Sequence, residues 1–211
     1  MKIKKKVALS GLLLCCAITA KAQVCITPQA EQRARELVSQ MTLEEKIDYI
    51  SGPKSFYIRA VPRLGIPEIR MADGPQGIRN NTQSTLYPCG ILSASTWNRK
   101  LARELGHGLA RDAKARGVSI LLGPGVNIYR SPLCGRNYEY FGEDPYLTAQ
   151  LGTAFVHGLQ GNDPRYLKAS ACAVHSGPEW NRSFFNAEVS NQDLWDTYLP
   201  AFQKLVTDAK V

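Results

Sequence analysis

Apolar and polar positions follow two periods along the chain, which predicts short strands separated by amphipathic helices. Strands are expected at four apolar runs, namely Ile66–Ala72, Ile91–Ala94, Val118–Leu122 and Leu167–Val174. Helices are expected where apolar residues recur every three or four positions, namely at 30–41, Leu43–Ile50, Asn98–Arg116, 145–159 and 191–211. Because strands and helices alternate, the pattern predicts parallel strands joined by helical crossovers.

Helix starts are marked by capping residues in three places. The pairs are Thr42 with Glu45, Asp144 with Pro145, and Ser190 with Asp193. A side-chain oxygen at these positions accepts hydrogen bonds from the first free backbone N–H groups of a helix. Pro200 lies inside the last predicted helix, where the missing N–H group is expected to kink it.

Two architectures accommodate this order, the open doubly wound sheet and the (β/α)8 barrel. A dinucleotide-binding open sheet would carry G-x-G-x-x-G after a strand, and Gly123-Pro124-Gly125 lacks the third glycine. Polar residues instead follow several strand ends, which is where barrel enzymes carry their chemistry. A complete barrel needs about 250 residues. We therefore expect an α/β fold in which about four βα units form a partial (β/α)8 TIM-type barrel.

The first 22 residues have the pattern of a secretory signal peptide. Lysines open the chain, an apolar run covers Val7–Ala20, and Ala20-Lys21-Ala22 provides small residues for cleavage after Ala22. The run is shorter than the about 20 residues of a membrane span. The sequence thus predicts residues 1–22 as a signal peptide and 23–211 as a secreted or periplasmic protein. An uncleaved N-terminal anchor is the alternative.

Removing the signal peptide changes the meaning of the net charge. The whole chain of 211 residues carries a formal charge of +8, from 26 basic and 18 acidic residues. Cleavage removes five lysines and no acid, so 21 basic residues remain and the charge falls to +3. We therefore expect no nucleic-acid partner and no membrane association after cleavage. The sequence does not predict an oligomeric state.

Four cysteines remain after cleavage, and they leave the disulfide question open. Cys25, Cys89, Cys134 and Cys172 allow three pairings, among which the sequence does not choose. Unpaired thiols that pack as small apolar groups are the alternative. No C-x-x-C pair and no histidines at ligand spacing occur, so no metal and no cofactor are expected.

Asp73 is the first candidate for chemistry. It follows a predicted strand and precedes Gly74-Pro75, so the turn can hold its carboxylate in a fixed direction. A carboxylate placed in this way can accept two hydrogen bonds from neighbouring sugar hydroxyls, and such charge-assisted bonds are strong. The alternative is an Asx turn, in which Asp73 only bonds its own backbone.

Arg136 is the second candidate, in a segment that holds one cation, three acids and three aromatic residues between Gly135 and Pro145. Its guanidinium group can donate paired hydrogen bonds to a ligand while a nearby acid fixes its orientation. Aromatic rings suit the apolar faces of sugars. The alternative is a structural loop with an Arg–Glu ion pair, in which Asp144 serves only as a helix cap.

His175 is the third candidate, because it directly follows the last predicted strand. An imidazole there can act as an acid, a base or a hydrogen-bond donor. The other two histidines, His107 and His157, lie on predicted helices and are expected to pack or face solvent. The chain has no G-x-S-x-G turn, and the serines near these segments lack a paired base, so the sequence does not support a Ser-His-Asp triad.

Three segments together resemble glycoside hydrolase family 3, the group of β-glucosidases and β-xylosidases. They are MADGPQGIR at Met71–Arg79, the stretch from Trp97 to GRNYEYFGEDPYL, and VHSGPEWNR at Val174–Arg182. The resemblance covers essentially all of residues 23–211. It implies the N-terminal barrel domain of the family and retaining hydrolysis of terminal β-D-glucosyl or xylosyl residues. GRNYEYFGEDP is more similar to the β-glucosidase branch.

The resemblance also implies roles for two of the candidates. Asp73 matches the aspartate that holds the hydroxyls of the terminal sugar, and Arg136 matches the arginine that grips the same sugar. The implied ligand is a β-linked oligosaccharide or a β-glucoside, and no cofactor is implied. The family also has a Lys-His pair before a segment like AVHSGPE, whereas residues 171–179 read ACAVHSGPE. Either the pair is deleted or His175 takes the histidine position; the lysine is lost in both alignments.

The resemblance assigns the nucleophile to an aspartate on a later strand and the acid/base to a later domain. No residue of the chain matches either motif, so no catalytic residue is assigned and the 211 residues are expected to be inactive alone. Two alternatives remain. The chain is a non-catalytic carbohydrate-binding remnant, or it is one piece of a split or frame-shifted enzyme gene.

Overall fold

The computed structural model describes residues 27–79, 83–163, 165–174 and 188–211; the predicted signal peptide lies outside them. The helices are α1 Pro28–Gln40, α2 Leu43–Ile50, α3 Gly90–Ser95, α4 Arg99–Ala115, α5 Pro145–Gln160, α6 Asn191–Asp193 and α7 Pro200–Thr207. The strands are β1 Tyr57–Ile58, β2 Ile69–Asp73, β3 Ile120–Gly125 and β4 Ser170–Val174. Single helical turns are the 3-10 turns η1 Pro62–Leu64 and η2 Asn137–Glu139, and the π turn η4 Leu194–Tyr198.

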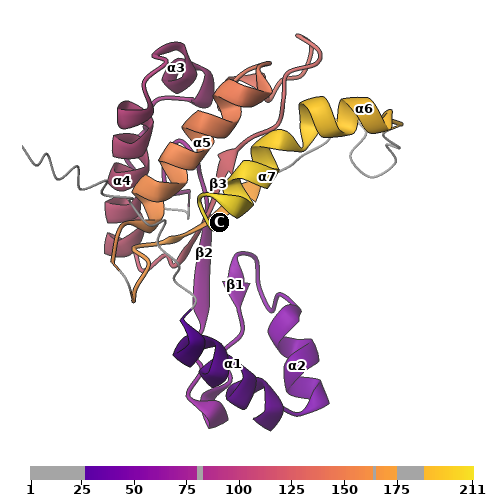
Figure 1. Cartoon of the computed structure of the whole chain (residues 1–211). Coiled ribbons are helices and arrows are strands. Elements are labelled where there is room, and N and C mark those ends of the chain that lie inside the picture. The colour runs from indigo at the N-terminus through magenta and orange to yellow at the C-terminus, as the bar shows by residue number, and fades with distance from the viewer. Residues whose placement is uncertain (1–26, 80–82, 164, 175–187) are drawn as a thin grey trace, which may run out of the picture.

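The four strands form one mixed sheet in the order β1-β2-β3-β4 (Figure 1). Strands β2, β3 and β4 are parallel, as the sequence predicts, and β1 pairs antiparallel with β2. The two-residue strand β1 is too short to leave a periodic pattern. The parallel strands end together, because Asp73 pairs with Leu122 and Leu122 pairs with Cys172.

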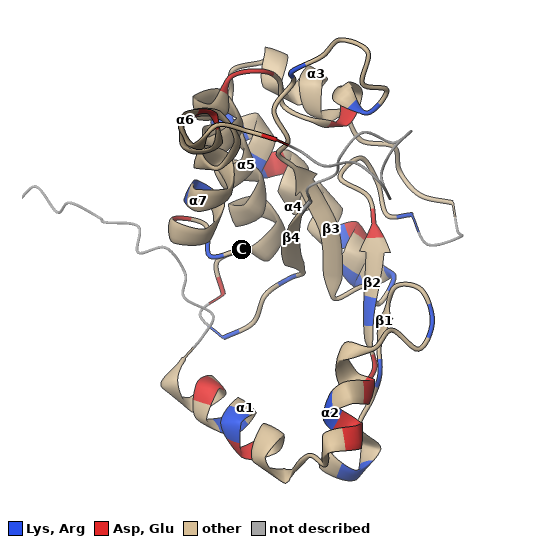
Figure 2. Ribbon diagram, turned by 90° about the vertical axis from the view of Figure 1, so that its right-hand side faces the viewer, with Lys and Arg blue, Asp and Glu red and all other residues tan. Residues whose placement is uncertain are grey.

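The sheet has one covered face and one partly open face. Ala72, Leu121 and Ala171 form a row across β2, β3 and β4, and all three are buried. The next row is more accessible, since Leu122 is half-buried and Cys172 is exposed. Figure 2 shows helices α5 and α7 on one side of these strands. The helices therefore cover the first row and leave the second open.

Helices α4 and α5 pack closely enough for backbone to meet backbone. A Cβ atom added at Gly106 would lie 2.2 Å from the Phe155 carbonyl oxygen, and one at Gly158 would lie 2.0 Å from the Arg103 carbonyl oxygen. Both helices start at side-chain caps: the Asn98 side chain accepts from two backbone N–H groups of α4, and the predicted cap Asp144 does the same for α5. Glycine at the crossing lets these two helices form the main helical layer of the core.

The prediction of a strand at Ile91–Ala94 is wrong, because these residues lie in helix α3. Ser93 and Ala94 are buried while Ile91 and Leu92 are 39% and 55% exposed, so burial does not alternate. The Ser93 N–H donates to the Cys89 carbonyl at 3.0 Å, which closes a helical turn. A short apolar run does not distinguish a strand from one helical turn.

The C-terminal helix is broken where the proline predicts a kink. Ser190 caps α6 by accepting from the Asp193 N–H group, the π turn follows, and α7 starts at Pro200. A proline in the first turn of a helix removes no hydrogen bond from it. The single predicted helix is therefore three consecutive helical pieces.

Helices α1 and α2 form a separate pair that is joined to the sheet through β1 and β2 (Figure 1). The predicted capping box is present, since Thr42 accepts from the Glu45 N–H group and Glu45 accepts from the Thr42 N–H group. Glu45 also pairs with Arg63 at 2.6 Å. None of the helices in the described part of the chain is long and apolar enough to cross a membrane.

Candidate functional site

The loops that follow β2 and β3 meet at one edge of the sheet. Pro75, after β2, packs against Gly123 of β3, where an added Cβ atom would lie 3.2 Å from the Pro75 Cβ. Gly125 ends β3 and faces the Tyr140 ring in the same way, at 2.9 Å. Because parallel strands bring their carboxyl ends together, the loops that carry Asp73 and Arg136 are neighbours at this edge.

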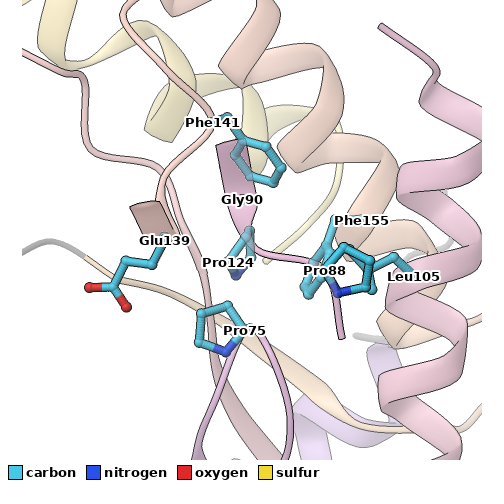
Figure 3. Close-up of a pocket in the computed structure, with 9 residues that line it drawn as sticks. Pro75, Pro88, Gly90, Leu105, Pro124, Glu139, Phe141 and Phe155 are labelled. Atoms are coloured by element: carbon cyan, nitrogen blue, oxygen red, sulfur yellow. The ribbon is translucent and has the colours of Figure 1, made fainter. Parts of the chain in front are cut away.

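A small cavity lies beneath the two loops (Figure 3). Its lining residues are Pro75, Pro88, Gly90, Leu105, Pro124, Gly125, Glu139, Phe141 and Phe155. The cavity encloses about 10 Å³, which is the space of about one water molecule. In Figure 3 the Glu139 carboxylate points away from the apolar lining. This region is therefore packed and leaves no room for a ligand larger than water.

Asp73 is the last residue of β2 and is held by a tight loop. Its carbonyl accepts from the Arg79 N–H group at 2.8 Å, and its carboxylate pairs with the Arg79 guanidinium group. Gly74 has φ +135°, and an added Cβ would lie 1.7 Å from the Gly77 carbonyl oxygen. The loop therefore requires glycine, and it leaves the Asp73 side chain 37% exposed at the strand end.

Arg136 precedes the η2 turn and pairs with Glu139, the last residue of that turn. The Arg136 Nε donates to Glu139 Oε1, and the Arg136 and Glu139 side chains are 25% and 8% exposed. The ion pair expected in this loop is present. The pair holds the guanidinium group in a loop that packs at the same sheet edge as the loop after Asp73.

Tyr129 stabilises this loop and has no distinguishing pattern in the sequence. Its hydroxyl group donates to the Asn137 carbonyl oxygen and lies 3.3 Å from the Tyr140 carbonyl oxygen. Burial raises the pKa of Tyr129 to about 12, because the apolar surroundings disfavour the phenolate. The Tyr129 N–H group also donates to the Gly142 carbonyl at 3.1 Å. Tyr129 thus joins the two arms of the loop around Arg136.

The candidate His175 lies outside the described residues, and its role stays a prediction. It directly follows Val174, which ends β4 and pairs with Gly125 of β3. His107 is exposed and contacts Lys168 at 3.1 Å, while burial lowers the pKa of the half-buried His157 on α5. Among the residues that the structure describes, no three His, Cys, Asp or Glu side chains are grouped to hold a metal ion.

Comparison with proteins of known sequence finds relatives that are named as beta-glucosidases or as a beta-xylosidase. The chain is 37% identical to beta-glucosidase BoGH3A of Bacteroides ovatus over 200 residues, which cover 87% of this chain and 26% of that protein. It is 38% identical to a xylan 1,4-beta-xylosidase of Xylanibacter ruminicola, over 95% of this chain and 26% of that one. The chain thus spans about a quarter of the length of the curated relatives it matches.

Solved structures give the same result. The beta-glucosidase DesR of Streptomyces venezuelae, in complex with D-glucose, superposes with a TM-score of 0.77 at 38% identity, covering 83% of this chain and 23% of that one. Beta-glucosidase 3B of Thermotoga neapolitana, in complex with glucose, gives 0.74 at 34% identity, covering 84% and 28%.

The family model described as the glycosyl hydrolase family 3 N terminal domain matches residues 34–211, which include both loops of the site. The protein therefore belongs to glycosyl hydrolase family 3.

Proposed function

We propose that this chain provides the part of a retaining β-glucosidase that binds the terminal, non-reducing sugar. The observation that carries the proposal is the position of Asp73 and Arg136 in neighbouring loops at the carboxyl edge of the sheet. The Asp73 carboxylate would accept hydrogen bonds from two adjacent hydroxyl groups, and the Arg136 guanidinium group would donate to the same sugar. Relatives named as beta-glucosidases support this ligand class.

We further propose that strands β2 to β4 are the first strands of a (β/α)8 barrel. The open row of the sheet supports this, because Leu122 is an apolar residue on the face that the helices do not cover. Parallel sheets normally have both faces buried. In a barrel the open face would turn inward, and Asp73 would lie at the carboxyl end where barrel enzymes bind substrates.

Hydrolysis by the retaining route needs a carboxylate nucleophile and an acid/base. No residue of the 211 matches either motif, and we propose that these residues alone bind sugar without turning it over. The chain, assayed with an aryl β-glucoside, should release no aglycone above the buffer rate. Hydrolysis that is lost in an Asp or Glu variant of this chain would overturn this part of the proposal.

Sugar binding is tested by calorimetric titration of the full chain with glucose. Asp73→Asn keeps the size of the side chain and removes its charge, so glucose affinity should fall about tenfold or more, which corresponds to about 1.4 kcal/mol. The matched control is Asp48→Asn on α2, an exposed carboxylate that pairs only loosely with Arg59, at 3.9 Å. Equal affinities for glucose in all three proteins would refute the proposed site.

Xylose is the second candidate sugar, because one relative is named as a β-xylosidase. Both sugars have the adjacent hydroxyl groups that Asp73 would hold, and they differ at the carbon that xylose lacks. Titration of the same chain with xylose decides between them. Tighter binding of xylose than of glucose would replace the glucosidase assignment by the xylosidase one.

Export is the remaining proposal, because the signal-peptide pattern lies in residues outside the described part of the chain. We propose that the protein is secreted or periplasmic and that the mature chain starts at Gln23, after Ala22. Expression in an exporting bacterial host, followed by N-terminal sequencing of the released protein, tests this. Recovery of the chain only in the cytoplasm with its N-terminus intact would contradict it.

A further inference from the structure

Two of the cysteines, Cys89 and Cys134, lie in segments that contact the η2 turn of the loop after β3. Cys89 stands between Pro88 and Gly90, and both of these neighbours line the small cavity together with Glu139. Cys134 lies in the loop after β3, and its carbonyl accepts from the Asn137 N–H group at 3.1 Å. Asn137 and Glu139 are the two ends of the η2 turn. Cys134 therefore contacts one end of this turn, and the neighbours of Cys89 lie beside the other end.

The packing between these segments is tight. A Cβ atom added at Gly90 would lie 2.4 Å from the Glu139 carbonyl oxygen, so the chain next to Cys89 touches the turn with backbone. The Tyr129 hydroxyl lies close enough to both cysteines to interact with them. Burial is the main cause that raises the pKa of Tyr129, and Cys89 and Cys134 raise it further. All three thiols are free in the structure; Cys89 and Cys134 are partly buried, whereas Cys172 is exposed on β4.

We propose that Cys89 and Cys134 form a disulfide that ties the start of α3 to the loop carrying Arg136. Cysteines in two segments that contact one three-residue turn are candidates for the Cα separation of about 4.4–6.8 Å that a disulfide needs. Cys134 lies two residues before Arg136, so the bond would anchor the loop beside the proposed sugar-binding side chain. The proposal selects one pairing among those that the sequence leaves open, and it does not depend on sugar binding.

The bond forms by two exchange steps with a disulfide oxidant such as glutathione disulfide. One cysteine loses its proton, and its thiolate attacks a sulfur of the oxidant, which gives a mixed disulfide and releases one glutathione thiolate. The thiolate of the second cysteine then attacks the protein sulfur of the mixed disulfide, forms the Cys89–Cys134 bond and releases the second glutathione thiolate. Two electrons pass to the oxidant, and the released thiolates take up the two protons.

Peptide mapping without reduction tests the pairing on the full chain. Trypsin places Cys25, Cys89, Cys134 and Cys172 on separate peptides, with Cys89 in 80–99 and Cys134 in 131–136. After oxidation by glutathione disulfide, these two peptides should run as one linked species that reduction separates. Cys172→Ser is the matched control and should keep the link, while Cys134→Ser should lose it and leave Cys89 carrying one glutathione.

The folded chain should favour this pairing, whereas oxidation in concentrated urea should give a mixture of pairings. The bond restrains the unfolded chain, so the midpoint of thermal unfolding should rise on oxidation by about 4 °C or more. The Cys89→Ser, Cys134→Ser double variant should show no such rise. Alkylation of both cysteines in the oxidised folded chain, or a link from either one to another cysteine, would overturn the proposal.

Discussion

Two ion pairs hold the side chains that we propose bind sugar, and burial decides which pair matters more. Arg79 pairs with Asp73 while 65% and 37% of these side chains are exposed, so the pair is worth at most about 1 kcal/mol. Glu139 is only 8% exposed beside Arg136. Removing one partner of a buried pair costs about 3–5 kcal/mol, because the other charge stays behind. The orientation of Arg136 therefore depends on Glu139 far more than that of Asp73 depends on Arg79.

Glu139→Gln tests this dependence at the residue scale. The amide keeps the size of the side chain but loses the charge that Arg136 Nε contacts, so the free energy of unfolding should fall by about 1.5–3 kcal/mol. Glucose affinity, measured by calorimetry, should fall with it as the guanidinium group loses its fixed direction. The control is Glu36→Gln in the exposed pair with Arg33, which should change stability by less than about 0.5 kcal/mol. An unchanged Glu139→Gln protein would show that Arg136 is positioned by other groups.

Tyr129 gives the loop a pH dependence. Its pKa is about 12 in the folded chain, against an ordinary value of 10.0, because burial disfavours the phenolate. A raised pKa adds stability that is complete below about pH 10 and is lost as the pH rises from about 10 to about 12. Urea unfolding across this window should show a steeper loss in the wild type than in Tyr129→Phe. The exposed Tyr166→Phe is the control and should follow the wild type; equal slopes for all three would contradict the burial of this hydroxyl.

At the scale of elements, the sequence predicts best those helix starts that depend only on neighbouring residues. The caps at Thr42, Asp144 and Ser190 mark helix starts correctly, because a cap needs only its own side chain and the next backbone N–H groups. Strand β1 depends on its pairing with β2, and the helical turn α3 depends on packing against η2, so neither leaves a clear local pattern. In the candidate site, the sequence points to Asp73 and Arg136, whose roles stay predictions. The sequence does not point to Tyr129, because this residue acts by donating hydrogen bonds to backbone carbonyl groups that lie further along the chain.

The crossing of α4 and α5 sets two effects against each other. Gly158→Ala should stabilise helix α5 by up to about 1 kcal/mol through helix propensity. The new Cβ would however lie 2.0 Å from the Arg103 carbonyl oxygen, and overpacking against backbone costs about 1–3 kcal/mol or more. We expect net destabilisation, measured as a lower urea midpoint with an unchanged slope.

Gly152→Ala in the same helix is the matched control for this substitution. Its nearest contacts would be the Leu205 and Val126 side chains at 3.1 and 3.3 Å, which can move aside. The control should stay within about 1 kcal/mol of the wild type. If both variants were equally stable, the two helices would not meet through backbone at Gly158.

At the scale of the whole molecule, the sheet ends in an edge that other chains can pair with. Among the described residues, β4 has a strand partner only on the β3 side, and the sheet face that carries Leu122 and Cys172 is not covered by the helices. Unpaired edges next to an apolar face promote association between chains. We therefore expect the 211-residue chain to form concentration-dependent oligomers at micromolar levels.

Cys172→Lys tests this expectation, because a lysine on an exposed edge strand is a common protection against edge pairing. Light scattering after size-exclusion chromatography, with a reductant present, should show smaller particles for Cys172→Lys than for the wild type. Cys172→Ser is the control: it removes the thiol without adding charge, and it should associate like the wild type. If the serine variant alone were monomeric, association would occur through the thiol. If the wild type were monomeric at every concentration, the β4 edge and the open sheet face would not drive association.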